Sequence, residues 1–385
     1  MKTLIKGAKI VLYDRVLDGE NLLIEDGIIA KITNDTPDAD EVIALSGEWL
    51  VPGFVDLHCH GGDGYDLMDG GDASQRIAEY HLAHGTTSLS LTTLADRDEA
   101  LSSALDAVAT LMDSGELQNV VGVHLEGPWL APSQAGAQKP ESMHAPIEGE
   151  LEELKMRYPF ITRISAAPEL DPEGIFAAEA LSLGILPAIA HTDATFSDVE
   201  AAISHGYRLM THLYSGMKGV ERKNSFRIAG AVEAGLYFDD LFVEVIADGK
   251  HLPYELLRYI YKLKGSDRIC LVTDAIRAAG LPDGSRTKIG SMKDGLDVVV
   301  EDGVAKLVGA ESFAGSTAAF DRIYRTMREA TGCDMVSLSR MASTTPAGLL
   351  GLSDRGEIKV GLRADLVVLT TDLKIKNVFL GGNKI

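Results

Sequence analysis

Residues 51–60, VPGFVDLHCH, begin a series of eight short apolar runs that follow one another through the middle of the chain. Strands buried on both faces have this nearly continuous apolar character, and segments with helical patterns lie between the runs. Eight such units predict an α/β fold, a (β/α)8 barrel of the TIM type, with its active site at the C-terminal strand ends. The other runs are TTSLSLTTL (86–94), VVGVHLEGPW (120–129), ITRISAAPE (161–169), ILPAIAHTDA (185–194), RLMTHLYSGM (208–217), LFVEVIADGKH (241–251) and RICLVTDA (268–275).

Both ends of the chain differ from this central part. Short β-like runs with turn signals occupy residues 1–50, and residues 355–385 have the same character. We interpret the two ends as one small, discontinuous β-sandwich domain, since chain termini commonly lie close together. Two independent decorations of the barrel are the alternative. The barrel is then assigned to residues 51–354.

The composition excludes several classes of protein. The formal net charge is −21, a field that repels nucleic acid and anionic membranes, so neither is an expected partner. No apolar stretch approaches the roughly 20 residues of a membrane span, and lysines interrupt the N-terminal segment, which therefore does not resemble a signal peptide. The three cysteines are odd in number and widely spaced, which favours a reducing cytoplasm over a disulfide framework.

Imidazole and carboxylate side chains stand at the ends of several predicted barrel strands. His58 and His60 are two residues apart and share one face of the first strand. Glu126 ends the VVGVHLE part of the third run. His191 ends the ILPAIAH part of the fifth, and His212 ends the RLMTH part of the sixth. These strand ends meet at one end of a barrel, so we expect the five residues to form a binding site for a divalent metal. Zn²⁺ or Fe²⁺ suit the donors best, with Mn²⁺ or Co²⁺ also possible. Isolated loop or core histidines are the alternative.

Two further residues fit the chemistry of a metal-assisted hydrolysis. Asp274 ends the eighth strand and is the expected general base for a metal-bound water, whose pKa the metal lowers from about 15.7 towards 7. The resulting hydroxide would attack a carbonyl carbon. His251, just past the seventh strand, would polarise that carbonyl, although a surface histidine is the alternative. His124 lies one layer below Glu126 and is interpreted as a hydrogen-bonded core residue.

These residues in this order resemble the amidohydrolase superfamily and, within it, the N-acetylglucosamine-6-phosphate deacetylase family. The resemblance runs nearly end to end, and it implies hydrolysis of the N-acetyl group of a 6-phosphorylated amino sugar to acetate and the free amino sugar phosphate. It also implies a homodimer in which a loop of one subunit reaches the site of the other. The motifs that carry it include PGFVDLHCHGGDGYDLMD, GVHLEGPWLAPSQAGAQ, AHTDAT, THLYSGM, ADGKHLP and LVTDAI.

The resemblance assigns roles position by position. Glu126, His191 and His212 match the family's metal ligands, Asp274 matches its acid–base residue, and His251 matches its substrate-binding histidine. The family's first-strand HxH pair can hold a second metal. That pair is retained here as His58 and His60, which implies a two-metal site bridged by Glu126.

Substrate recognition departs from the family pattern at three places. Gln138 stands where the family often has histidine, and Ser215-Gly216 where it has Asn-Ala in contact with phosphate. The segment RKNSFR (222–227) replaces an Arg-Glu-Pro-Gly segment whose arginine holds the phosphate, so Arg222 and Arg227 are both candidates. A solvated loop is the other interpretation of these basic residues.

Three other functions are alternatives to this one. The first is deacetylation of another N-acetylated sugar, either N-acetylgalactosamine-6-phosphate or an unphosphorylated one. The second, a cyclic amidase of the dihydroorotase kind, is disfavoured because the fourth run lacks the bridging lysine of those enzymes. The third, a catalytically silent sugar-phosphate sensor, is disfavoured because every expected catalytic residue is present.

Overall fold

A computed structural model describes residues 1–115 and 118–385 of the chain. Its centre is a sheet of eight parallel strands, in the order β19-β18-β15-β14-β13-β12-β11-β8. The backbone N–H of Asp274 donates to the carbonyl of His58 at 2.9 Å, so the ends of the first and last strands are joined and the predicted barrel is confirmed. The strands are β8 (Phe54–Cys59), β11 (Thr86–Thr93), β12 (Val120–Glu126), β13 (Ile161–Ala166), β14 (Leu186–Ile189), β15 (Leu209–Met210), β18 (Phe242–Ile246) and β19 (Ile269–Val272).

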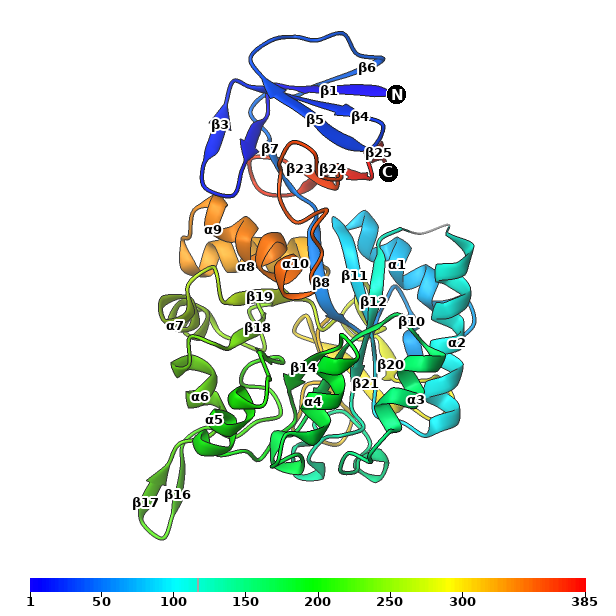
Figure 1. Cartoon of the computed structure of the whole chain (residues 1–385), viewed down its shortest axis with the longest axis vertical. Helices are drawn as coiled ribbons and strands as arrows, with labels where there is room; N and C mark the ends of the chain where they lie inside the picture. The colour runs from blue at the N-terminus through cyan, green and yellow to red at the C-terminus, as the bar shows by residue number, and fades with distance from the viewer. Residues whose placement is uncertain (116–117) are drawn as a thin grey trace.

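Helices pack around the outside of the barrel (Figure 1). Their apolar residues recur every three or four positions and face the strands, as Phe320, Ile323, Tyr324 and Met327 do in α8. The helices are α1 (Ala73–Ala83), α2 (Asp98–Ser114), α3 (Glu150–Arg157), α4 (Ile175–Ser182), α5 (Phe196–Ser204), α6 (Ala231–Tyr237), α7 (Tyr254–Lys264), α8 (Phe320–Thr331), α9 (Met335–Ser339) and α10 (Thr345–Leu349). None of the helices in the described part of the chain has the length and apolar character that a membrane span requires.

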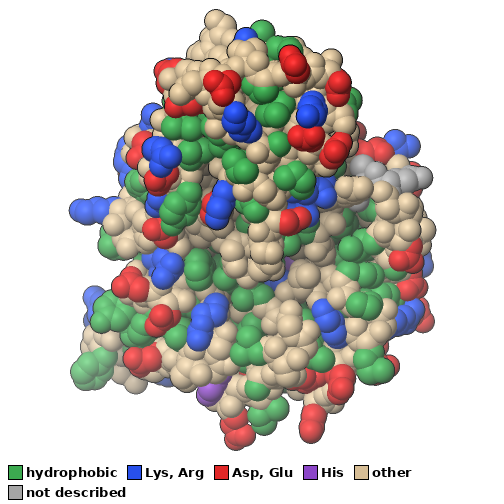
Figure 2. Space-filling model, turned by 45° about the horizontal axis from the view of Figure 1, so that its top comes forward, with side chains coloured by type: hydrophobic (Ala, Val, Ile, Leu, Met, Phe, Trp, Pro, Cys, Tyr) green, Lys and Arg blue, Asp and Glu red, His purple; other side chains and the backbone are tan. Residues whose placement is uncertain are grey.

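The two ends of the chain meet in a pair of sheets beside the barrel (Figure 1). One sheet contains β1 (Lys2–Lys6), β4 (Asn21–Glu25), β5 (Ile28–Thr33) and β6 (Glu41–Ala44). The other joins both ends, with β2 (Lys9–Val11), β3 (Val16–Asp18), β7 (Trp49–Pro52), β23 (Leu366–Leu369), β24 (Ile375–Leu380) and β25 (Asn383–Lys384). A shared apolar core packs the sheets together, with Leu22 from the first and Leu50 and Phe379 from the second. On the face drawn in Figure 2, acidic and basic side chains are interspersed over this region and the barrel.

Loops and small sheets extend the barrel connections. A three-stranded sheet follows β19, and the hairpin β16–β17 projects from the molecule (Figure 1). The short strands are β9 (Gly61–Gly62), β10 (Tyr65–Asp66), β16 (Glu221–Lys223), β17 (Phe226–Ile228), β20 (Arg286–Ile289), β21 (Leu296–Glu301) and β22 (Val304–Leu307). The short helical turns are η1 (Leu67–Asp69), η2 (Pro132–Gln134), η3 (Pro140–Ser142), η4 (Pro168–Leu170) and η5 (Arg340–Thr344).

Candidate active site

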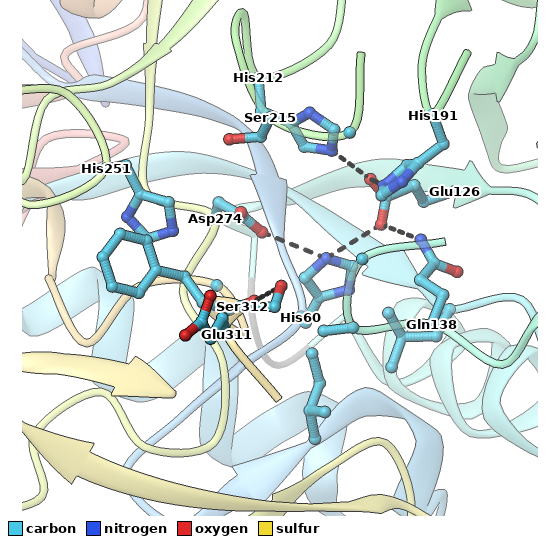
Figure 3. A pocket seen from close by; sticks show the side chains of 17 residues that line it. His60, Glu126, Gln138, His191, His212, Ser215, His251, Asp274, Glu311 and Ser312 are labelled. Carbon is cyan, nitrogen blue, oxygen red and sulfur yellow. Dashed lines mark hydrogen bonds and ion pairs between the residues drawn. The ribbon is translucent and has the colours of Figure 1, made fainter. Parts of the chain in front are cut away.

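A buried carboxylate, Glu126, lies among four histidines at one end of the barrel, and three of them, His60, His191 and His212, are seen around it in Figure 3. The Oε1 atom of Glu126 is 2.8 Å from Nε2 of His212 and 3.2 Å from Nε2 of His191. The same oxygen is 3.6 Å from Nε2 of His58, and Oε2 of Glu126 is 3.4 Å from Nε2 of His60. All five side chains are buried. The fold therefore brings together residues that four different barrel strands supply.

Three residues of the site have backbone conformations that L-amino acids rarely adopt. The φ angle is +41° at His191, +29° at His212 and +45° at Asp274, and each residue lies just beyond its strand rather than in it. The predicted strands ending at His191, His212 and Asp274 are therefore too long, because left-handed φ angles of this size lie outside the β region for residues with a side chain. Such conformations cost on the order of 1–3 kcal/mol each and cluster at functional sites.

Gly216 fits closely against one of these residues. A Cβ atom at position 216 would lie 2.6 Å from Nδ1 of His191, and φ is +57° there. Both the close approach and the backbone conformation require glycine. Gly216, which stands where the family has alanine, thus leaves room for the His191 ring.

Hydrogen bonds on the far side of the rings orient the histidines. In three of the four, Nδ1 faces an acceptor, which leaves Nε2 with a lone pair towards Glu126. The pairs are His58 with Glu244 (3.2 Å), His60 with the carbonyl of Thr92 (3.2 Å) and His191 with the carbonyl of Gln134 (2.7 Å). His124 lies outside this group, with Nε2 2.7 Å from the hydroxyl of Ser165, in agreement with its interpretation as a core residue.

Neighbouring charges shift the ionisation of the cluster. Burial alone would lower the pKa of His58, but the charges of Glu126 and Asp274 raise it well above its ordinary value. Hydrogen bonds to the same carboxylates raise the pKa of His60 to about 9 against the effect of burial. Burial would raise the pKa of Glu126, yet the histidines hold it well below its usual range. The cluster therefore favours positive charge beside its carboxylates, which protons or a metal cation can supply.

The donor atoms are arranged so that a cation fits. The cluster contains two groups of possible ligands, His58–His60–Glu126 and Glu126–His191–His212. Within each group the ligand atoms all lie within 4.8 Å of one another, and the carboxylate of Glu126 belongs to both groups. Imidazole nitrogens and carboxylate oxygens that face each other are all acceptors when unprotonated, so a cation satisfies them together. Nitrogen and oxygen donors of this kind are typical of divalent transition-metal sites.

Asp274 and His251 approach the cluster from neighbouring strands (Figure 3). Oδ1 of Asp274 is 3.3 Å from Nε2 of His60 and 3.5 Å from Nε2 of His58. His251 is oriented by Asp248, whose Oδ2 lies 2.8 Å from Nδ1, and its ring packs against Phe313. Burial would lower the pKa of His251, but the hydrogen bond and charge of Asp248 raise it.

One cavity of about 260 Å³ opens onto these groups. Its wall includes nine of the predicted site residues and the apolar side chains of Leu94, Ile289 and Phe313, whereas His58 is not part of the wall. The predicted residues in the wall are His60, Glu126, Gln138, His191, His212, Ser215, Gly216, His251 and Asp274.

Gln138 is engaged within the protein at both ends of its amide. Its Oε1 accepts a hydrogen bond from the backbone N–H of Ala95 at 2.7 Å, and its Nε2 donates to Oε2 of Glu126 at 2.6 Å. A contact with substrate would use the second hydrogen of Nε2 or the second lone pair of Oε1.

The structure does not bring the two predicted arginines into the cavity. Arg222 and Arg227 lie on the exposed hairpin β16–β17, where they face each other across the two strands. Among the described residues that line the cavity, none is lysine or arginine.

Two buried charged residues next to the site were not singled out from the sequence. Glu244 contacts His58, and Arg163 contacts Glu244 from β13. Both interrupt otherwise apolar runs, ITRISAAPE and LFVEVIADGKH, and a charge inside such a strand is costly unless it is paired. That interruption is the signal that could have identified them.

Comparisons with known proteins show the family of this chain. The model of the amidohydrolase family matches residues 49–385. The N-acetylglucosamine-6-phosphate deacetylase of Lysinibacillus sphaericus is 32% identical over 93% of this chain and 91% of its own length. The N-acetylgalactosamine-6-phosphate deacetylase of Escherichia coli O157:H7 is 31% identical over 99% of both chains. A mutant N-acetyl-D-glucosamine-6-phosphate deacetylase of Mycobacterium smegmatis, in complex with N-acetyl-D-glucosamine-6-phosphate, superposes with a TM-score of 0.90 at 30% identity, covering 100% of this chain and 98% of the other.

Proposed function

Because the chain belongs to the amidohydrolase family, we propose that it hydrolyses N-acetylglucosamine-6-phosphate to acetate and glucosamine-6-phosphate. The observation that carries this proposal is the meeting of Glu126, His60, His191, His212, Asp274 and His251 around one cavity, with His58 directly behind them. Relatives of nearly the same length that are named for this reaction support the choice of substrate.

The proposed cofactor is a divalent cation. Glu126, His191 and His212 would hold one ion, and His58 and His60 would hold a second together with Glu126. These donors suit Zn²⁺ or Fe²⁺, and also Mn²⁺ or Co²⁺. When bound, such a cation polarises a carbonyl oxygen and lowers the pKa of a water molecule that it holds.

Asp274 is the proposed general base and acid. Burial would raise its pKa, but the charges of His58 and His60 lower it to about 2, so the carboxylate is ionised near neutral pH. It accepts the proton of the attacking water and then donates it to the amine nitrogen as the C–N bond breaks. His251 donates a hydrogen bond to the carbonyl oxygen, where negative charge develops.

Asp248→Asn is expected to shift the pH dependence of kcat/KM. Asp248 raises the pKa of His251, so the imidazolium form persists to higher pH than in an ordinary histidine, and kcat/KM falls as pH rises through that pKa. Loss of the carboxylate lowers the pKa and should move this alkaline limb to lower pH. Asp321→Asn is the control, because it breaks another aspartate–histidine pair, with His84 at 3.0 Å, outside the cavity. An unmoved limb in Asp248→Asn would exclude His251 as the group that titrates.

The phosphate group needs a positive charge from outside the cavity. Arg222 and Arg227 face each other on the projecting hairpin (Figure 1), and like charges directly opposite destabilise a strand pair. An anion between or beside them would relieve that repulsion. We therefore place this hairpin at the cavity of a second copy, in a homodimer.

Arg227→Ala is expected to raise KM for the phosphorylated substrate with little change in kcat. A hydrogen bond to a charged group contributes about 1.5–3 kcal/mol, which corresponds to roughly 10- to 100-fold in KM. Arg258→Ala is the control, since this exposed arginine on α7 pairs with Glu255. An unchanged KM would move the phosphate contact elsewhere, and Arg222 would be tested next.

The cellular setting we assign is reducing. Cys59, Cys270 and Cys333 are all buried and free. Free thiols persist in the cytoplasm, where we place the protein and its amino sugar substrate.

Acetate release from three substrates tests the proposed function. They are N-acetylglucosamine-6-phosphate, its galactosamine epimer and unphosphorylated N-acetylglucosamine, with the metal content measured on the same sample. Preferential turnover of the first supports the proposal. Faster turnover of either of the other two substrates would mean that the enzyme is a deacetylase with a different substrate. If none of the three releases acetate, the proposed function is refuted.

A further inference from the structure

A buried ion pair lies inside the barrel beneath the histidine cluster. Glu244 projects from the middle of β18 and Arg163 from β13, and both side chains are fully buried and in contact through Nη1 and Oε1. Arg163 also donates from Nη1 to the carbonyl of Leu57 at 3.1 Å and from Nη2 to the hydroxyl of Thr211 at 2.8 Å. The guanidinium thereby fixes the position of the carboxylate against two further strands.

This pair is expensive for the fold. Apolar side chains of similar volume commonly replace a buried ion pair with no loss of stability, because removing two charges from water offsets their attraction. Neither residue is part of the cavity wall, so neither contacts substrate there. The pair does contact the histidine cluster, because the second carboxylate oxygen of Glu244 faces His58.

That second oxygen fixes which nitrogen of His58 carries the proton. Oε2 of Glu244 lies 3.2 Å from Nδ1 of His58 and also accepts the backbone N–H of His212 at 3.1 Å. An ionised carboxylate only accepts, so Nδ1 must donate, and in the neutral imidazole that binds a metal the lone pair lies on Nε2. The Nε2 atom faces Nε2 of His60 at 3.0 Å and the carboxylates of Glu126 and Asp274.

His60 is set in the same tautomer from the other side, because its Nδ1 faces the carbonyl oxygen of Thr92. When both rings are neutral, as metal ligands are, their two Nε2 lone pairs lie 3.0 Å apart next to two carboxylates and form a site composed only of acceptors. A histidine that donates its outer N–H to a carboxylate is also a more basic ligand.

We propose that Glu244, held by Arg163, is a positioning residue that prepares the His58–His60 side of the cluster to bind its own divalent ion. This inference rests on the metal assignment in the proposed function. The His191–His212 side depends on Glu244 only through the backbone of His212 and should keep its ion without the carboxylate.

Glu244→Gln tests the tautomer directly. The amide oxygen is drawn to the Arg163 cation, which turns the NH2 group towards Nδ1 of His58 and forces the proton onto Nε2. Loss of such an outer contact typically weakens metal affinity by about 10- to 100-fold. After dialysis against Zn²⁺ at a fixed free concentration, mass spectrometry should count two ions per chain in the wild type and one in Glu244→Gln.

A second variant separates positioning from a merely structural role. In Arg163→Met/Glu244→Gln the cation is gone, so the amide oxygen is free to face His58 and the second ion should return. Asp171→Asn is the control, because it alters another buried carboxylate, which accepts the N–H groups of Phe176 and Ala177, and it should keep both ions. Circular dichroism confirms that each variant is folded.

Two results would overturn the inference: a single ion in the wild type, or two ions in folded Glu244→Gln. If that variant does not fold, ¹⁵N-histidine NMR of the zinc-loaded wild type decides, since a proton on Nε2 of His58 contradicts the proposal and one on Nδ1 supports it. Acetate release is measured in parallel. An active wild type with an unchanged ion count in Glu244→Gln refutes only this inference, whereas absent turnover refutes the proposed function.

Discussion

Asp274→Asn is expected to reduce kcat for acetate release by about 10²- to 10⁴-fold, the range that general acid–base catalysis contributes. Asparagine has the same shape but accepts no proton from water and returns none to the amine. The φ angle of +45° at this position is tolerated better by asparagine than by most residues, so the backbone should be retained.

The metal content separates this outcome from a collapsed site. Asp274 lies outside the two groups of ligand atoms around Glu126, so its replacement should leave the ions in place. Asp267→Asn is the matched control, because Asp267 precedes the same strand at the opposite end of the barrel and pairs with Arg340 on the surface. A folded, metal-loaded Asp274→Asn enzyme with near-wild-type kcat would remove Asp274 as the acid–base.

Glu126→Gln is expected to remove both the bound metal and the activity. Glu126 is shared by the two ligand groups, and its oxygens approach four histidines between 2.8 and 3.6 Å. An amide is a far weaker ligand and cancels no cationic charge. If the cation contributes about 4 kcal/mol to the barrier reduction, kcat falls by roughly 10³-fold.

The measurement is ion content together with turnover after dialysis. Glu150→Gln is the control, because Glu150 lies outside the cavity. It accepts a hydrogen bond at 2.7 Å from the indole of Trp129, a residue that follows the strand of Glu126. Full metal occupancy in folded Glu126→Gln would mean that the ions are held elsewhere.

The barrel and the members of its candidate site could be predicted because both follow from local pattern. Continuous apolar runs identify strands buried on two faces, and the polar residue at the end of each run identifies the C-terminal side of the barrel. The strand ends were less accurate at His191, His212 and Asp274, where the chain leaves the β conformation with a positive φ angle. At His191 the ring also packs closely against Gly216, a contact that local sequence does not encode.

The sequence by itself determined the fold class, the reaction chemistry and the residues placed around Glu126, because position along a strand decides which end of the barrel a side chain occupies. Only the tertiary structure decided the atomic contacts. It shows Gln138 bound to Glu126, Arg163 and Glu244 paired beneath His58, and Arg222 and Arg227 on a hairpin away from their own cavity. Such contacts join strands that lie far apart in the chain, and their geometry is set by barrel closure, which no local periodicity encodes.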